Sequence, residues 1–98
     1  MENSNFEEKY CIITVDVYCT DITNAPRYRV FVDNYLITER NFVFDEQYVR
    51  ENIFVNLAPG EHTFHLECET DNFTYTNLTV NNRLLGYEPR NKVTSFSI

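Results

Sequence analysis

Few residues of this chain have the types and the spacing that catalysis or metal binding requires. His62 and His65 lie three positions apart, a spacing that on a helix would let both side chains bind one zinc ion. The surrounding segment instead alternates apolar and polar residues, which predicts a β-strand, where side chains three positions apart point to opposite faces. The two histidines therefore cannot share one metal ion, and we predict no metal site.

No serine or cysteine lies in a recognisable catalytic motif. The serines are Ser4, Ser95 and Ser97. The cysteines are Cys11, Cys19 and Cys68. They alternate with aliphatic residues, so we predict that they are buried and unreactive. Cys11 and Cys19 share one predicted strand at a separation of about 26 Å, which is too far for a disulfide. A bond from Cys68 to either of them is geometrically possible, but we expect thiols, and we assign no catalytic residue and no cofactor.

Carboxylates are plentiful, but their spacing specifies no chemistry. Those in or near expected loops are Asp33, Glu39, Asp45, Glu46 and Glu51. Hydrolysis of a sugar would need two carboxylates facing each other across a cleft, and calcium would need several oxygen ligands from one loop. No D-x-D-x-D-G run supports calcium binding. Glu51 lies on an otherwise apolar strand face, so we expect it to pair at a sheet edge with Arg40 or with neighbours of Arg50.

The charge balance argues against a nucleic-acid partner. The net charge is −7, and Arg27 and Arg29 form the one basic pair that shares a strand face, which we interpret as a solvated surface. No apolar run approaches the 18 residues or so of a membrane span. The first eight residues are polar and acidic, unlike a signal peptide. We therefore expect synthesis in a reducing cytosol, without membrane contact.

The elements that position these residues are strands. Period-two alternation and Asn-rich or Pro-Gly turns predict strands at residues 9–20, 27–33, 36–44, 48–57, 61–69, 73–80 and 93–98, with a short return at 84–85. The polar run Glu39-Arg40-Asn41 predicts a bulge. Seven or eight strands at this spacing indicate an antiparallel β-sandwich, Ig-like or jelly-roll. Residues 9–98 should form this single domain, and residues 1–8 a flexible arm.

The same alternation predicts which side chains are buried and which are exposed. The expected core includes Val15, Val17, Val30, Val32, Val55, Phe64 and Leu66. The aromatic side chains on outward faces are Tyr10, Tyr18, Phe31, Tyr48 and Phe54. Exposed aromatics mark a sugar platform or a protein interface, and the chain lacks the Trp that sugar platforms favour. We therefore predict a partner interface to which Tyr10, Tyr18, Arg27, Arg29 and Phe31 contribute.

The framework of strands and turns also resembles known proteins. The segments Tyr28–Asp33, Leu36–Arg40, Tyr48–Ile53 and Leu57–Thr63 look like small β-sandwich virion proteins of tailed phages, notably the T4-like phages of marine cyanobacteria. The "PGEHTF" turn and strand, followed by Asn77–Asn81, is similar to calcium-dependent carbohydrate-binding modules. The resemblance covers roughly residues 27–82 and rests on framework motifs.

This resemblance implies a function without catalysis. It points to a virion structural protein, either a capsid decoration or a tail or neck accessory, made in the host cytoplasm. Such a protein would bind a major capsid or tail protein in many copies per assembly. The alternative is a calcium-dependent carbohydrate-binding module that binds a surface glycan, from which the chain departs in lacking Trp and an obvious calcium cluster.

Overall fold

The chain folds into strands alone over the part that the structure describes. This computed structural model describes residues 7–44, 47–85 and 93–98. Its strands are β1 (Lys9–Cys19), β2 (Arg27–Val32), β3 (Tyr35–Asn41), β4 (Tyr48–Leu57), β5 (Glu61–Cys68), β6 (Phe73–Val80), β7 (Arg83–Leu84) and β8 (Val93–Ser97). Within these residues there is no helix that could cross a membrane. Most of the expected arm, residues 1–6, lies outside the described residues, whereas Glu7 and Glu8 are exposed and precede β1.

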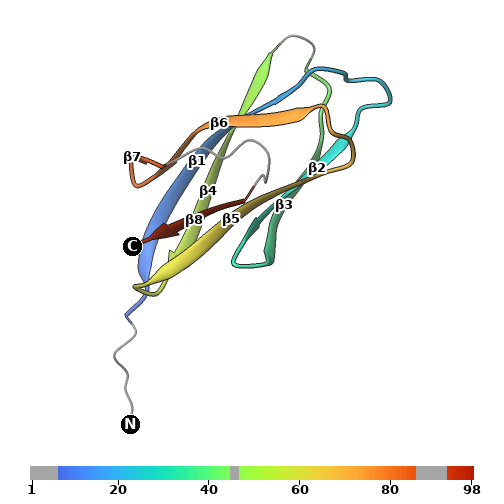
Figure 1. Cartoon of the computed structure of the whole chain (residues 1–98). Helices are drawn as coiled ribbons and strands as arrows, with labels where there is room; N and C mark the ends of the chain where they lie inside the picture. Colours follow the sequence, from blue (N-terminus) through green and yellow to red (C-terminus); the bar gives the residue numbers. More distant parts are fainter. Residues whose placement is uncertain (1–6, 45–46, 86–92) are drawn as a thin grey trace.

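Two four-stranded antiparallel sheets form the layers of a sandwich (Figure 1). The first sheet has the order β4-β1-β6-β7, and the second has the order β3-β2-β5-β8. The β-sandwich prediction is confirmed.

Asparagine and aspartate residues make the tight turns. Asp33 and Asn34 have φ angles of 53° and 68° in the β2–β3 hairpin, and Asn81 and Asn82 have 51° and 69° between β6 and β7. Positive φ at both central residues of a two-residue hairpin is the turn geometry that matches the twist of paired strands. Asp and Asn tolerate this geometry better than most residues, which explains how a chain with two glycines forms so many turns.

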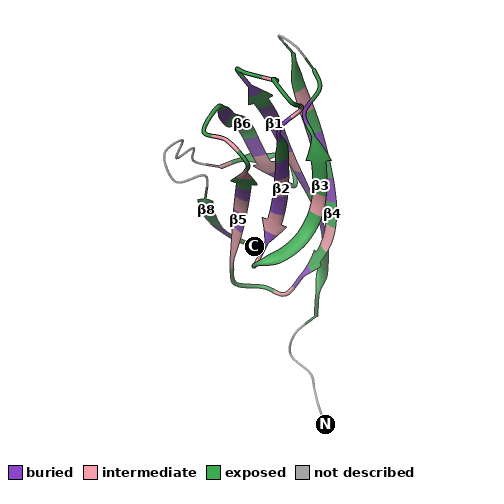
Figure 2. Ribbon diagram, turned by 90° about the vertical axis from the view of Figure 1, so that its right-hand side faces the viewer, coloured by how far each residue is buried: buried purple, intermediate pink, exposed green. Residues whose placement is uncertain are grey.

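The core lies between the inner faces of the two sheets, where buried segments of β1, β2 and β6 face inward (Figure 2). Six of the seven predicted core residues are buried: Val15, Val17, Val30, Val32, Phe64 and Leu66. Val55 is only half-buried because β4 is an edge strand. The aromatic part of the core is larger than expected and contains Tyr28, Phe42, Phe64, Phe73, Tyr75 and Phe96.

A buried polar group joins the two sheets at the side where the edge strands β3 and β4 meet. Glu51 of β4 is 6% exposed and accepts a hydrogen bond from the Tyr28 hydroxyl of β2. The Arg40 guanidinium of β3 donates from Nε to the same carboxylate at 2.8 Å. The expected pairing of Glu51 with Arg40 is confirmed, and the contact with Tyr28 adds a second partner. Burial is the main cause that raises the pKa of the Tyr28 hydroxyl, and the neighbouring Glu51 carboxylate raises it further. The hydroxyl therefore keeps its proton and remains a donor.

The strand at residues 36–44 departs from its prediction. It runs from Tyr35 to Asn41. Val30 of β2 pairs with Thr38 and Phe31 pairs with Leu36, so Ile37 has no partner on β2 and forms a bulge. The residues Glu39, Arg40 and Asn41 pair regularly with β2, so the bulge prediction was wrong there. The polar run does not interrupt the strand because Arg40 turns inward to Glu51, while Glu39 turns outward to Arg29.

Candidate functional site

The five predicted interface residues lie on two opposite surfaces. Tyr10 and Tyr18 are on β1, and their side chains cover the outer face of the first sheet. Arg27, Arg29 and Phe31 are on β2, and their side chains cover the outer face of the second sheet. Because the sheets pack through their inner faces, the structure does not bring these two groups together. They define two surfaces that must be considered separately.

The first surface, here called the aromatic face, is the outer side of β1 and β4. It consists of Tyr10, Ile12, Tyr18, Tyr48 and Phe54, all of which are exposed. Ile12 pairs with Phe54 at one end, and Tyr18 pairs with Tyr48 at the other. The Tyr10 and Phe54 rings lie 6.1 Å apart at an angle of 8°, and these side chains are 63% and 57% exposed. The aromatic face therefore has an apolar cluster at each end.

A rigid polar centre separates the two clusters. Asp16 of β1 lies opposite Arg50 of β4, and their side chains pair through Nε–Oδ1 at 2.8 Å and Nη2–Oδ2 at 3.2 Å. Asn77, which has a φ of 55° where β6 shifts register against β1, donates from Nδ2 to Oδ2 of Asp16 at 2.9 Å. Asp16 is consequently 5% exposed, although its position in β1 places it on the outer face of the sheet. The Arg50 hydrogen bond, against the opposing effect of burial, lowers the pKa of Asp16 and keeps it charged.

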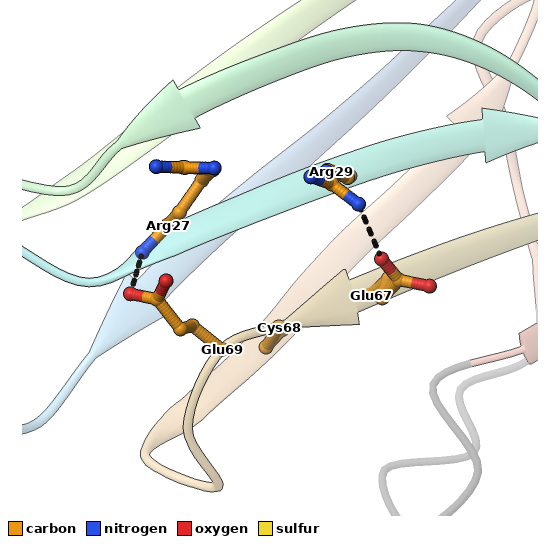
Figure 3. Close-up of a pocket in the computed structure, with 5 residues that line it drawn as sticks. All are labelled: Arg27, Arg29, Glu67, Cys68 and Glu69. Atoms are coloured by element: carbon orange, nitrogen blue, oxygen red, sulfur yellow. Dashed lines mark hydrogen bonds and ion pairs between the residues drawn. The ribbon is translucent and has the colours of Figure 1, made fainter.

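The second surface, here called the charged face, is the outer side of β2, β3 and β5. Arg29 bonds from Nε to Glu39 at 2.5 Å and from Nη1 to Glu67 at 3.2 Å, so its guanidinium is held between two glutamates. The Arg27 backbone amide donates to the Glu69 carboxylate at 3.1 Å (Figure 3). The Arg27 guanidinium lies 3.8 Å from the Glu39 carboxylate. Both arginines are therefore paired within the chain, as expected of a solvated strand face, and each exposed ion pair contributes little to stability.

The remaining predicted interface residue on this side, Phe31, already has an intramolecular neighbour. Its ring stacks on His65 of β5 at 5.7 Å and it is half-buried. Phe31 therefore offers less uncovered apolar surface than Tyr10 or Phe54. The aromatic face, and not the charged face, is the stronger candidate for an interface.

His62 occupies a polar site at the end of the sandwich, on the opposite side of β5 from His65. Its Nδ1 faces Oδ2 of Asp33 at 2.5 Å, and its Nε2 faces the Ala58 carbonyl at 2.6 Å. Both neighbours are acceptors, so both ring nitrogens donate when the imidazole is protonated. Burial disfavours the charge on His62, but the hydrogen bonds to Asp33 and Ala58 outweigh it and raise the pKa of the imidazole above 6.5. The site thus ties the β2–β3 hairpin to the β4–β5 turn.

We expect the stability that His62 contributes to depend on pH. Because its pKa is higher in the folded state, the contribution is complete below pH 6.5 and is lost as the pH rises through the raised pKa. The wild type should therefore be more stable than His62→Gln below pH 6.5, and this difference in the free energy of unfolding should shrink as the pH rises through the raised pKa. Denaturant titrations of both proteins at successive pH values give the measurement. His65→Gln serves as the control, and a difference that stays constant with pH would contradict the assignment.

The described residues form no cluster of side chains that could bind a metal ion. Within residues 7–44, 47–85 and 93–98 no group of three or more His, Cys, Asp or Glu side chains could hold a metal ion. Two of the carboxylates considered from the sequence, Asp45 and Glu46, lie outside those residues. Comparisons of the chain with models of protein families, with curated proteins and with solved structures find no match. The site that the geometry defines is a two-strand aromatic surface on a β-sandwich.

Proposed function

We propose that this protein is a non-catalytic binding module that docks on a larger protein assembly through its aromatic face. The observation that carries the proposal is the exposure of five large apolar side chains on the adjacent strands β1 and β4. Groups of exposed aromatic side chains mark protein interfaces, which concentrate their binding energy in Tyr, Trp and Arg anchors. Arg50, which is hydrogen-bonded to Asp16, supplies such an anchor between the two apolar clusters.

The dimensions of the aromatic face favour a protein partner. Ile12 and Tyr18 are six residues apart on an extended strand, so the two apolar clusters are separated by about 20 Å. A surface of that length with a fixed ion pair in the middle suits a partner that contacts many side chains at once. The resemblance to phage virion proteins supports a virion as the setting, with a major capsid or tail protein as the partner. Repetition in many copies would strengthen a modest single contact.

The test is to remove one apolar cluster and measure docking. The double variant Tyr10→Ala with Phe54→Ala should lose affinity for the assembly by about 30-fold, corresponding to about 2 kcal/mol, because interface anchors lose at least that much on truncation. Occupancy on purified particles, counted by quantitative mass spectrometry, gives the measurement. Phe31→Ala with Leu36→Ala removes apolar side chains from the opposite sheet and should leave occupancy unchanged. Wild-type occupancy of the first variant would place the interface elsewhere.

The alternative function, a carbohydrate-binding module, is favoured by the same Tyr10–Phe54 pair. Two exposed, nearly parallel rings form an apolar surface on which a sugar ring can pack. Glycan-array binding that a chelator abolishes would support a calcium-dependent module, and binding that a chelator leaves unchanged would support a calcium-independent one. No detectable binding on the glycan array, together with retention of the protein on particles, would support the protein-docking function.

A further inference from the structure

A pocket that the docking function does not use opens between the two edge strands β3 and β4. Its volume is about 500 Å³, and it lies at the end of the sandwich where the β2–β3 hairpin and the β4–β5 turn meet. Its apolar walls are formed by Val32, Ile37, Val55 and Leu57. The exposed Tyr35 ring lies at its margin. The size and the lining suit one or two branched aliphatic side chains.

The ionisable groups of the pocket give it a negative charge in either state of its histidine. Glu8 and Asp33 carry negative charges, and His62 is the one cationic group among the lining residues. With His62 protonated the pocket carries a net charge of −1, and with His62 neutral it carries −2. A group that binds beside the apolar walls is therefore favoured when it carries a positive charge, and the Tyr35 ring adds a surface that attracts cations.

The strands that border the pocket can also pair with an added strand. Among the described residues β3 pairs only with β2 and β4 only with β1, so each strand has one edge of unpaired backbone N–H and C=O groups. Exposed edges of this kind bind extended peptides by strand addition, while side-chain pockets provide the specificity. Tyr35, Leu36 and Ile37 leave the β3 edge apolar and uncovered.

We propose that this pocket takes an aliphatic side chain from an extended, basic segment of a partner protein that lies along the β3 edge. A second copy of this chain is disfavoured because its net charge is −7. Four of the five described arginines, Arg27, Arg29, Arg40 and Arg50, are already in ion pairs, and the fifth, Arg83, donates a hydrogen bond to the Ser97 carbonyl. The pocket is separate from the aromatic face, so the two sites can be tested independently.

The test uses three short peptides and the full-length protein: acetyl-KLKLK-amide, acetyl-ELELE-amide and acetyl-KSKSK-amide. The KLKLK peptide should shift the NMR methyl signals of Val32, Val55 and Leu57. The affinity of each of the other two peptides should be at least about tenfold lower. Ile37→Lys places a cation at the pocket wall and should abolish those shifts. Leu84→Lys adds the same charge to an exposed residue of β7, at the far edge of the other sheet, and should leave the affinity within about twofold.

Three outcomes would overturn the proposal. The first is equal binding of the KLKLK and ELELE peptides. The second is equal binding of the KLKLK and KSKSK peptides, because that result would reveal non-specific attraction of basic peptides to an acidic protein. The third is equal weakening by Ile37→Lys and Leu84→Lys. The Tyr10→Ala and Phe54→Ala double variant should bind the KLKLK peptide as the wild type does, so failure of one site does not imply failure of the other.

Discussion

Replacing Glu51 with Ala should lower the free energy of unfolding by about 3 kcal/mol, a large fraction of the stability of a small domain. The substitution removes the acceptor of the fully buried Tyr28 hydroxyl and the partner of Arg40 at the same time. A buried donor without an acceptor loses its hydration without compensation, which costs about 1–3 kcal/mol by itself. Urea denaturation followed by far-ultraviolet circular dichroism gives the measurement.

Glu67→Ala provides the matched control for this prediction. Glu67 also pairs with an arginine, but its side chain is half exposed on the charged face, so its removal should cost less than about 1 kcal/mol. Combining Glu51→Ala with Tyr28→Phe should cost less than the sum of the two single changes, because the second change removes the donor that the first leaves unsatisfied. If Glu51→Ala is no more destabilising than Glu67→Ala, the buried group does not hold the sheets together.

Replacing Phe42 with Ala should destabilise the fold by about 3–4 kcal/mol, as expected for a large core aromatic residue. Phe42 lies just beyond the end of β3, yet its side chain is fully buried. Its ring packs edge-on against Phe73 at 5.8 Å and tilted against Tyr28 at 6.3 Å, and its backbone amide bonds to the Pro26 carbonyl. The substitution would therefore leave a cavity where rings from both sheets meet.

Phe44→Ala tests whether this effect is specific to the buried ring. Phe44 lies two residues further on, is 38% exposed and contacts the edge of the Phe42 ring at 5.9 Å. Its truncation should lower the midpoint of thermal unfolding less than that of Phe42, because more than a third of the Phe44 surface already lies in water in the folded state, whereas Phe42 is fully buried. Equal midpoints for the two variants would show that the core does not depend on Phe42.

The alternation of residue types was sufficient to predict the strands and the direction of their side chains. A period of two repeats over six to eleven residues in β1, β2, β4 and β5, and six of the seven predicted core residues are buried. Side-chain direction within a strand is a local property, so the sequence carries it directly. The same reasoning identified Glu51 as a polar residue on a buried face and Arg40 as its partner.

The relations between strands were less accessible to sequence reasoning. Nothing local distinguishes the sheet of β1 from the sheet of β2, so Tyr18 and Phe31 were assigned to one interface although they lie on opposite faces. The burial of Asp16 depends on Arg50, 34 residues away, and on Asn77, 61 residues away. The bulge at Ile37 is likewise a property of the pairing with β2 and not of the strand itself.

Under the proposed docking mode, the placement of the aromatic and charged faces on opposite sides of the sandwich would have a consequence for the surface of a coated particle. A copy docked through its aromatic face would turn the outer side of β2, β3 and β5 toward water, with Glu39, Glu67 and Glu69 near the two arginines. At −7 per copy, a layer of such domains would give the particle a strongly anionic, hydrated coat. Coated particles would then repel one another, and their tendency to aggregate would increase with ionic strength as screening shortens the range of that repulsion.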